Sequence, residues 1–266
     1  MITSVQNVRI KRVCALQQKQ KERNSEGVFV VEGKKMMEET PVELIEEVFV
    51  TDTFYQHNKQ YLDALSLKSL ELVTDKVLLH MSTLVTPQGI LGVVRQRTTQ
   101  LNGLNLVNKP LLIALDNIQD PGNMGTIIRT ADAINAQGVI ISAGSVDIYN
   151  PKVVRATMGS IFRVPIIIEA DLVDVLMQLS KRDIRLYAAH LKGDDYYYSM
   201  DYKESTCFLI GNEGNGLSEE VAALASSYIK IPILGQAESL NAAVAAGILM
   251  YEAVRQREQS TCQANT

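Results

Sequence analysis

The chain has 266 residues and a formal net charge of −4; 46% of its residues are hydrophobic and 21% are charged. These proportions are those of a globular protein and exclude a disordered or fibrous one. The length allows two domains or one large one. No segment approaches the ~20 consecutive apolar residues of a membrane span, and no apolar run follows the charged N-terminus, so we expect neither a secretory signal nor a membrane partner.

The cysteines and histidines are few and scattered. Cys14, Cys207 and Cys262 form no CxxC pair, and the three histidines lie equally far apart. This pattern favours neither a disulfide framework nor a metal site, and it is typical of a protein from a reducing compartment. We therefore expect a cytoplasmic protein without a bound metal.

The charge is uneven along the chain. The first 35 residues contain eight lysines and arginines but only three glutamates. A basic segment on an acidic chain indicates one surface that faces nucleic acid. A solvated helix face is the alternative that the pattern leaves open.

The first hundred residues alternate short strands and helices. Strands are predicted at 28–32, 47–51, 71–74 and 90–95, and helices at 34–40, 56–65 and 74–82. This alternation predicts a small α/β domain. Residues 98–109 are rich in Asn, Thr and Gly and lack periodicity, so we place the division there, with domains at 1–100 and 108–266.

The second part repeats strand, loop and helix. Strands are predicted at 111–115, 139–142, 166–168, 185–190, 206–210 and 228–231, and helices at 126–136, 150–158, 172–180, 219–225 and 240–257. The pattern predicts a mostly parallel sheet with helices on both faces. Such sheets bind ligands at the carboxyl ends of their strands.

Three polar, glycine-bearing segments, 116–130, 209–217 and 231–252, flank these elements and are expected to meet at one site. The first follows a predicted strand and contains Asp116, Asn117 and Asp120. The second contains a glycine-rich loop, 211–216, which lets the backbone approach a ligand. The third places Ser239 as a helix cap with Asn241 in the first turn, where polar ligand atoms can be held.

In order and spacing these segments resemble the three signature blocks of the SpoU/TrmH branch of the SPOUT RNA methyltransferases. Residues 4–33 are similar to the L30e-like substrate-binding domain of rRNA-directed members. The resemblance implies an S-adenosylmethionine-dependent enzyme that methylates a ribose 2′-hydroxyl, in ribosomal RNA of the 23S type. It also implies a deep C-terminal trefoil knot and a homodimer.

The resemblance further implies the site residues. The catalytic group would be Arg129, Asn123, Glu213, Ser239 and Asn241. The cofactor would lie against Ala189, Gly211, Ile231 and Leu240. RNA would be bound by Arg9, Lys11, Arg12, Arg23, Lys152 and Arg155.

Several roles stay open at this point. Arg129 is interpreted as an ion-pair partner of Asp120 or Asp132, as an RNA phosphate ligand, or as a group that serves the reactive hydroxyl. A guanidinium stays protonated in proteins, so we favour a hydrogen bond to the developing alkoxide, or to a phosphate that takes the proton, over a general base. Asn123 could instead cap a helix, and Glu213 could instead accept hydrogen bonds from loop amides. Whether Arg129 acts in its own or the second subunit's site is not indicated.

Three other functions were weighed. A tRNA ribose methyltransferase would share the chemistry but differ in substrate. A non-catalytic RNA-binding protein would share the fold but has no need of five polar site residues. A nicotinamide-dependent oxidoreductase would use the loop 211–216, which lacks GxGxxG spacing.

Overall fold

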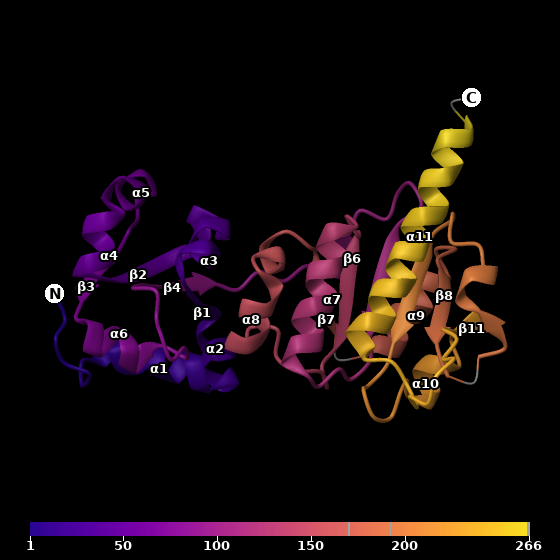
Figure 1. Cartoon of the computed structure of the whole chain (residues 1–266), viewed down its shortest axis with the longest axis horizontal. Helices are drawn as coiled ribbons and strands as arrows, with labels where there is room; N and C mark the ends of the chain where they lie inside the picture. Colours follow the sequence, from indigo (N-terminus) through magenta and orange to yellow (C-terminus); the bar gives the residue numbers. More distant parts are fainter. Residues whose placement is uncertain (170, 192, 265–266) are drawn as a thin grey trace. The chain divides into compact units, whose positions relative to one another are not determined.

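The computed structural model describes residues 1–169, 171–191 and 193–264, with side chains as far as residue 259 (Figure 1). The residues form two compact units, which we describe separately. The first contains Met1–Arg97 and Asp147–Phe162, and the second contains Thr98–Val146 and Arg163–Thr266. Segment Asp147–Phe162 thus comes from the middle of the chain but packs within the first unit.

The first unit contains a four-stranded sheet in the order β1-β4-β2-β3. β4 is antiparallel to both β1 and β2, and β2 is parallel to β3. One face is covered by α1 and α6, whose apolar residues share a buried cluster with those of the strands. The strands are β1 (Val28–Glu32), β2 (Ile45–Thr51), β3 (Leu70–Val73) and β4 (Ile90–Arg95), and the helices are α1 (Val8–Gln18), α2 (Gln20–Glu26), α3 (Lys34–Glu39), α4 (Asp52–His57), α5 (Lys59–Ala64), α6 (Asp75–Met81) and α8 (Pro151–Thr157).

The predicted strands of this unit are found within two residues of their expected ends, but the helix predicted at 56–65 is wrong in extent. Thr51 caps an earlier helix by accepting a hydrogen bond from the Phe54 backbone N–H at 3.2 Å. Asn58 then separates α4 from α5. The helix begins at Asp52 and not at residue 56, because the Thr51 side chain pairs with a backbone N–H of the first helical turn that would otherwise have no partner.

A buried ion pair holds segment Asp147–Phe162 to α2. Arg23 donates to the Asp147 carboxylate at 2.6 and 2.8 Å and to the Leu16 carbonyl at 2.6 Å. The Arg23 and Asp147 side chains are only 4% and 7% exposed. Arg23 was expected to contact RNA phosphate; this expectation is corrected, because its guanidinium is buried and bonded within the protein.

Tyr149 also holds segment Asp147–Phe162 within the first unit. The Tyr149 hydroxyl donates to the Arg97 carbonyl at 2.8 Å and accepts from the Arg97 N–H at 3.0 Å. Its ring lies 4.7 Å from that of Phe29 in β1. Burial raises the pKa of Tyr149 to about 12, although the hydrogen bond to Arg97 opposes the shift, so the hydroxyl remains a donor at neutral pH.

The second unit contains a seven-stranded sheet in the order β7-β6-β5-β10-β8-β11-β9. Every strand pair in it is parallel. The expected mostly parallel sheet is therefore confirmed, with the short edge strand β9 as an addition that the sequence pattern missed. The strands are β5 (Leu111–Leu115), β6 (Gly138–Ser142), β7 (Ile166–Glu169), β8 (Arg185–Ala189), β9 (Asp195–Tyr196), β10 (Thr206–Ile210) and β11 (Ser227–Lys230).

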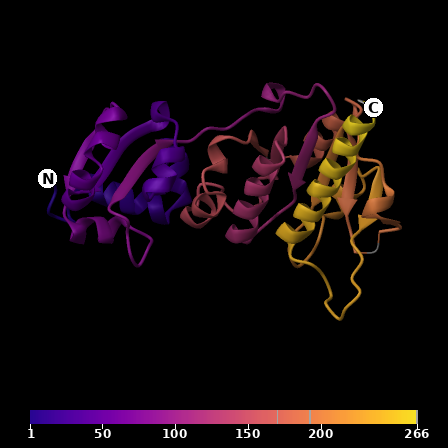
Figure 2. The ribbon, with the colours of Figure 1, turned by 45° about the horizontal axis from the view of Figure 1, so that its top comes forward.

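Helices cover both faces of this sheet (Figures 1 and 2). α9 (Leu172–Ser180) and α10 (Glu219–Ala222) share a buried cluster with alternate residues of the strands, such as Leu112 and Leu209. The intervening residues point to the other face, where α7 (Pro121–Ala133) packs beside α11 (Ala242–Ala264). The implied trefoil knot stays a prediction.

Other expectations concern the cysteines, metals and membranes. Cys207 is buried and Cys14 is half-buried, and neither forms a disulfide; the Cys262 side chain lies outside the described residues. Across the described ranges, no cluster of three or more His, Cys, Asp or Glu could hold a metal ion. In the same part of the chain, no helix has the length and apolar character to cross a membrane.

The buried pair should dominate the stability of the first unit. We expect Arg23→Leu to lower the free energy of unfolding of this unit by about 3–5 kcal/mol, because Asp147 is left buried and unpaired. Arg12→Leu is the control and should cost about 1 kcal/mol or less, since Arg12 is 32% exposed. Hydrogen exchange of β1 and β4 amides measures the change in this unit alone; equal losses in both variants would contradict the role of the pair.

Candidate active site

The three polar segments meet at the carboxyl ends of neighbouring parallel strands. The first lies between β5 and α7, the second follows β10, and the third precedes α11. β5 and β10 are paired in register from Leu111 and Thr206 to Leu115 and Ile210. The sheet thus brings residues about a hundred positions apart to one edge.

The glycine loop after β10 folds back on itself. The Asn212 and Gly216 backbones exchange two hydrogen bonds of 2.9 Å. A Cβ at Gly211 would lie 2.2 Å from the Gly216 carbonyl carbon and the Leu217 nitrogen. Gly211 is therefore required by close backbone approach, and the loop's shape depends on it.

Glu213 joins this loop to the first segment. Its carboxylate accepts from the Gln119 and Asp120 backbone N–H groups, each at 3.1 Å, and from Nδ2 of Asn123 at 2.9 Å. Partial burial alone would raise the pKa of Glu213, but these hydrogen bonds outweigh it and the net pKa is lowered. Glu213 thus accepts both from loop amides and from Asn123, and it helps to fix the orientation of the Asn123 amide.

Asn123 connects Glu213 to the third segment. Oδ1 of Asn241 accepts from the Ala243 and Val244 N–H groups at 2.9 and 3.3 Å, which turns its Nδ2 toward Asn123 Oδ1 at 2.8 Å. Because Asn123 Oδ1 accepts from Asn241, Asn123 Nδ2 is the group that faces Glu213, and it donates to the Glu213 carboxylate. We name the series Asn241–Asn123–Glu213 the amide chain; it fixes both amide orientations.

Two helix starts differ from expectation. α7 begins at Pro121 rather than Thr126, because Asp120 Oδ1 accepts from the Asn123 N–H at 2.8 Å and Pro suits the first turn. Asp120 is therefore the cap, and the capping alternative for Asn123 is wrong. α11 begins at Ala242, so Asn241 caps that helix, and the expected cap at Ser239 is corrected.

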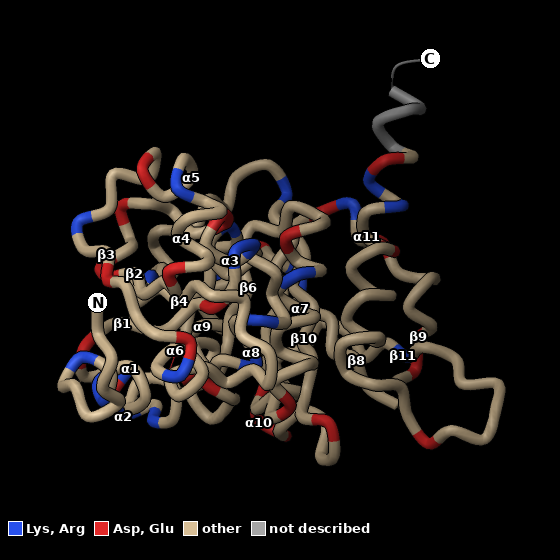
Figure 3. The backbone as a smooth tube through the Cα atoms, turned by 60° about the vertical axis from the view of Figure 1, so that its left-hand side comes forward, with Lys and Arg blue, Asp and Glu red and all other residues tan. Residues whose placement is uncertain are grey.

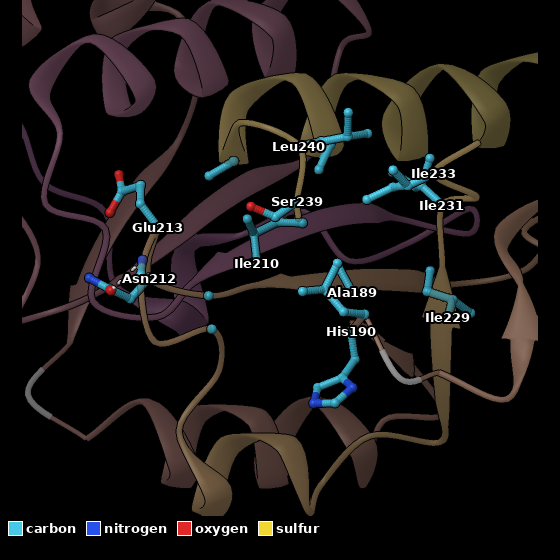
Figure 4. A pocket seen from close by; sticks show the side chains of 16 residues that line it. Ala189, His190, Ile210, Asn212, Glu213, Ile229, Ile231, Ile233, Ser239 and Leu240 are labelled. Carbon is cyan, nitrogen blue, oxygen red and sulfur yellow. Dashed lines mark hydrogen bonds between the residues drawn. The ribbon is translucent and has the colours of Figure 1, made fainter. Parts of the chain in front are cut away.

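A pocket opens beside the amide chain (Figure 4). It encloses about 810 Å³, including its open mouth, and lies at the carboxyl ends of β8, β10 and β11. Ala189, Gly211, Ile231 and Leu240, the four expected cofactor contacts, all line it, as do Glu213 and Ser239. In Figure 4 Leu240 lies on the α11 side and Ala189 on the strand side, with Glu213 at one end.

Sequence reasoning missed other lining residues, including His190, Ile229 and Ile233. Ile229 and Ile233 continue the two-residue alternation that places Ile231 in the pocket, a signal that could have been used. His190 directly follows β8 and forms an edge-to-face contact with Tyr228, with ring centroids 5.5 Å apart. The part of the pocket lined by Ile229, Ile231 and Ile233 is thus apolar, and Glu213 and Asn212 lie at the other end (Figure 4).

Arg129 lies apart from these residues. It is in the third turn of α7, since the helix begins at Pro121, and its side chain is exposed. Asp120 caps α7, and Asp132 is paired with Arg163 at 2.8 Å. Within the described part of the chain the Arg129 side chain makes no hydrogen bond or ion pair, so the structural ion-pair interpretation is not supported.

The expected RNA-contacting cations divide into two groups. Arg9 pairs with Glu47 and Glu71, and Arg12 pairs with Glu26 and Glu47. Figure 3 shows lysines and arginines interspersed with aspartates and glutamates along the backbone. The second group, Lys11, Lys152 and Arg155, is exposed and free of ion pairs among the described residues.

Two substitutions at Asn241 should separate helix capping from the amide chain. Asn241→Asp keeps an oxygen for the α11 amides but forces Asn123 to turn its amide, which then presents an oxygen to Glu213. We expect Asn241→Asp to lose activity, whereas Asn241→Ala should lose activity and, in addition, about 1 kcal/mol of stability. Thermal unfolding and turnover of both variants test this; wild-type activity in Asn241→Asp would contradict the amide chain's role.

Two family models and a protein of known name match this chain. Residues 110–251 match the SpoU rRNA Methylase family, and residues 7–92 match the MRM3-like substrate binding domain. The chain is 31% identical to the Bacillus subtilis 23S rRNA (guanosine(2553)-2′-O)-methyltransferase RlmP, over 94% of this chain and 97% of that protein.

Solved structures agree in fold. The AdoMet-bound SpoU methyltransferase AviRb from Streptomyces viridochromogenes is 28% identical with a TM-score of 0.84, covering 95% of this chain and 99% of that one. An AdoMet-bound rRNA methyltransferase from Sinorhizobium meliloti is 33% identical, also with a TM-score of 0.84, covering 96% and 97%. The chain belongs to the SpoU family of RNA methyltransferases.

Proposed function

We propose that this protein transfers a methyl group from S-adenosylmethionine to a ribose 2′-hydroxyl of ribosomal RNA, of the 23S type. The observation that carries the proposal is the amide chain, which joins three polar segments beside a pocket whose lining includes all four expected cofactor contacts. The similar RlmP is named for 2′-O-methylation of 23S rRNA. An RNA-binding protein that has lost catalysis would not need this arrangement.

The pocket suits S-adenosylmethionine. Its apolar lining, which includes Ile229, Ile231 and Leu240, can pack against an apolar adenine face. The two similar structures named above contain AdoMet. Bound there, the sulfonium supplies an electrophilic methyl group, while the protein aligns the acceptor oxygen behind it.

The chain's own residues must manage the proton and the developing charge. The acceptor hydroxyl must lose its proton as the oxygen is methylated, and a phosphate oxygen of the RNA would accept it. Arg129 is permanently charged, so it stabilises the developing alkoxide or a phosphate that accepts the proton. Ser239 lines the pocket and can hold polar ligand atoms, while Asn241 and Glu213 fix the orientation of the Asn123 amide beside it.

We further propose a homodimer in which Arg129 serves the second subunit's pocket. Arg129 lies six positions after Asn123 on α7, which places the two residues roughly 9 Å apart along the helix axis and about 120° apart around it. Arg129 therefore points away from the amide chain of its own subunit and is exposed. A symmetric contact between two copies would bring each Arg129 to the other site.

The first unit supports the substrate assignment. Its match to the MRM3-like substrate binding domain favours residues 1–100 as the RNA-binding domain and 108–266 as the methyltransferase domain. Lys11, Lys152 and Arg155, which have no ion-pair partner among the described residues, would contact phosphate. The tRNA-directed alternative lacks comparable support.

Label transfer tests the function. We expect methyl-labelled S-adenosylmethionine to label unmodified rRNA but not tRNA, in an alkali-resistant dinucleotide, because a methylated 2′-oxygen cannot assist strand cleavage. Arg129→Ala should abolish transfer while cofactor affinity, measured by calorimetry, stays within about twofold, as Arg129 does not line the pocket; Arg182→Ala is the exposed-arginine control. Label in tRNA alone would contradict the substrate assignment.

Subunit mixing tests the dimer. Arg129→Ala keeps an intact pocket, and Gly211→Ala keeps Arg129 but blocks the loop. If Arg129 acts across the interface, co-refolded mixtures should regain about a quarter of wild-type activity, because about half the dimers carry one complete site. Each variant alone should be inactive; an inactive mixture with proven heterodimers would place Arg129 in its own subunit's site.

A further inference from the structure

Two tyrosine rings lie stacked on the surface of the second unit. Tyr196 ends β9, and Tyr198 follows in the short 3-10 helix Tyr197–Ser199. Their ring centroids are 5.3 Å apart and their planes differ by 6°, which is the offset-stacked arrangement that aromatic rings favour. The two residues are 43% and 52% exposed, whereas Tyr187 and Tyr202 of the same unit are buried. We name Tyr196 and Tyr198 the tyrosine pair.

The surrounding structure holds the tyrosine pair in place. Tyr202 is buried beneath it, and its hydroxyl donates to the Tyr197 carbonyl at 2.6 Å. The Ser199 hydroxyl donates to the Tyr196 carbonyl at 2.7 Å, and β9 pairs with β11. The Tyr197 ring contacts that of Tyr198 edge-to-face, with centroids 5.2 Å apart. Rings that are already held in place lose little conformational freedom when a flat partner packs on them.

The tyrosine pair lies at the same edge of the sheet as the pocket beside the amide chain. β9 and β11 are parallel, and Tyr196 is in register with Lys230, the last residue of β11. Ile229 and Ile231, which flank Lys230 in the sequence, line that pocket (Figure 4). Adjacent strands are roughly 4.8 Å apart, so the pair begins one strand beyond the pocket. An RNA strand whose ribose is held at the pocket therefore has its neighbouring nucleotides near the pair.

The charges around the pair decide which part of an RNA suits it. The Lys230 ammonium lies 5.0 Å from the Tyr196 ring centroid, a cation–π contact. Lys230 forms no ion pair among the described residues. Asp194 and Asp195, which precede the pair, are exposed and repel phosphate. The RNA backbone is therefore favoured on the Lys230 side, and the uncharged face of a base suits the rings.

We propose that the tyrosine pair is a stacking platform for an unpaired base that neighbours the methylated nucleotide of the substrate RNA. Lys230 binds the adjoining phosphate. Every base has a π-face, so aromatic side chains stack on unpaired bases with little sequence preference. Stacking at this edge holds the strand while the target ribose enters the pocket, which favours a reactive alignment. This inference rests on the proposed RNA substrate.

Binding of short RNAs to the whole chain tests the platform by fluorescence anisotropy. The probes are an eight-nucleotide oligoadenosine and an abasic strand of equal length, with S-adenosylhomocysteine saturating the cofactor pocket so that adenine cannot enter it. The double variant Tyr196→Ala, Tyr198→Ala should bind oligoadenosine at least about fivefold more weakly than the wild type, the low end for one lost stacking contact. It should bind the abasic strand equally well. The matching double phenylalanine variant keeps both rings and should bind both probes like the wild type.

Two further measurements separate stacking from charge. A 2-aminopurine at the centre of an oligouridine should lose fluorescence on binding to the wild type, because stacking quenches it, and should keep it with the double alanine variant. Lys230→Met should weaken both anisotropy probes alike and lower the slope of log affinity against log salt by about 0.7, as one lost phosphate contact on a single strand predicts. An unchanged slope would remove Lys230 from the site. Met177→Ala, which removes an equally exposed apolar side chain from α9, is the control and should change none of these quantities.

Three outcomes of the double alanine variant overturn the inference: unchanged oligoadenosine affinity, an equal loss for the abasic strand, or a changed molar mass in light scattering. The last would make the pair a contact between copies of this chain. The same preparations are assayed for methyl transfer to rRNA. An active wild type with any of these outcomes removes the platform and leaves the function intact. A wild type whose 2-aminopurine signal depends on the tyrosines but which transfers no methyl group overturns the proposed function instead.

Discussion

The site depends on the side-chain amide of Asn123, which is shared between Glu213 and Asn241. Because Asn241 uses its oxygen to cap α11, it can offer Asn123 only a donor, and Asn123 must then offer Glu213 a donor. Residues 90 and 118 positions from Asn123 are thereby joined to it. The capping of α11 by Asn241 and the Glu213 carboxylate therefore fix the orientation of the Asn123 amide, which joins the three segments.

The parallel sheet makes this arrangement possible. β10, β8 and β11 are neighbours whose carboxyl ends lie at one edge and line one pocket. β5 pairs with β10, so the segment after β5 brings Asn123 to Glu213. Gly211 lets the loop after β10 close tightly enough to place Glu213 beside Asn123. The apolar pocket floor then continues directly from the strand residues Ile210 and Ile229.

The sequence pattern predicted strands that are apolar along nearly their whole length, and it failed where a single side chain decides a boundary. β1, β4, β5 and β10 have the expected ends, and each is buried throughout except for the last residue of β1 and of β4. The start of α7 was misplaced because Asp120-Pro121-Gly122 is typical of a turn, yet Asp120 and Pro121 cap and open a helix. The four expected cofactor contacts line one pocket, although their roles stay predictions.

Charge pairing over long sequence separations could not be predicted. Arg9 and Arg12 pair with Glu47, and Arg23 pairs with Asp147, and nothing local in the sequence indicates these partners. The basic N-terminal segment is therefore largely neutralised. Among the described residues, the expected RNA-contacting cations without an ion pair are Lys11 on α1 and Lys152 and Arg155 on α8. The sequence of α8 is in the methyltransferase match, but its residues pack in the first unit.

The most direct test of the amide chain is a double-mutant cycle between Asn241→Asp and Glu213→Gln, measured as kcat/KM for methyl transfer. These residues touch only through Asn123, so an interaction between them must pass through its amide. We predict a coupling of at least about 1 kcal/mol in the activation free energy. Additive effects, within about 0.3 kcal/mol, would show that the residues act independently and would contradict the amide chain.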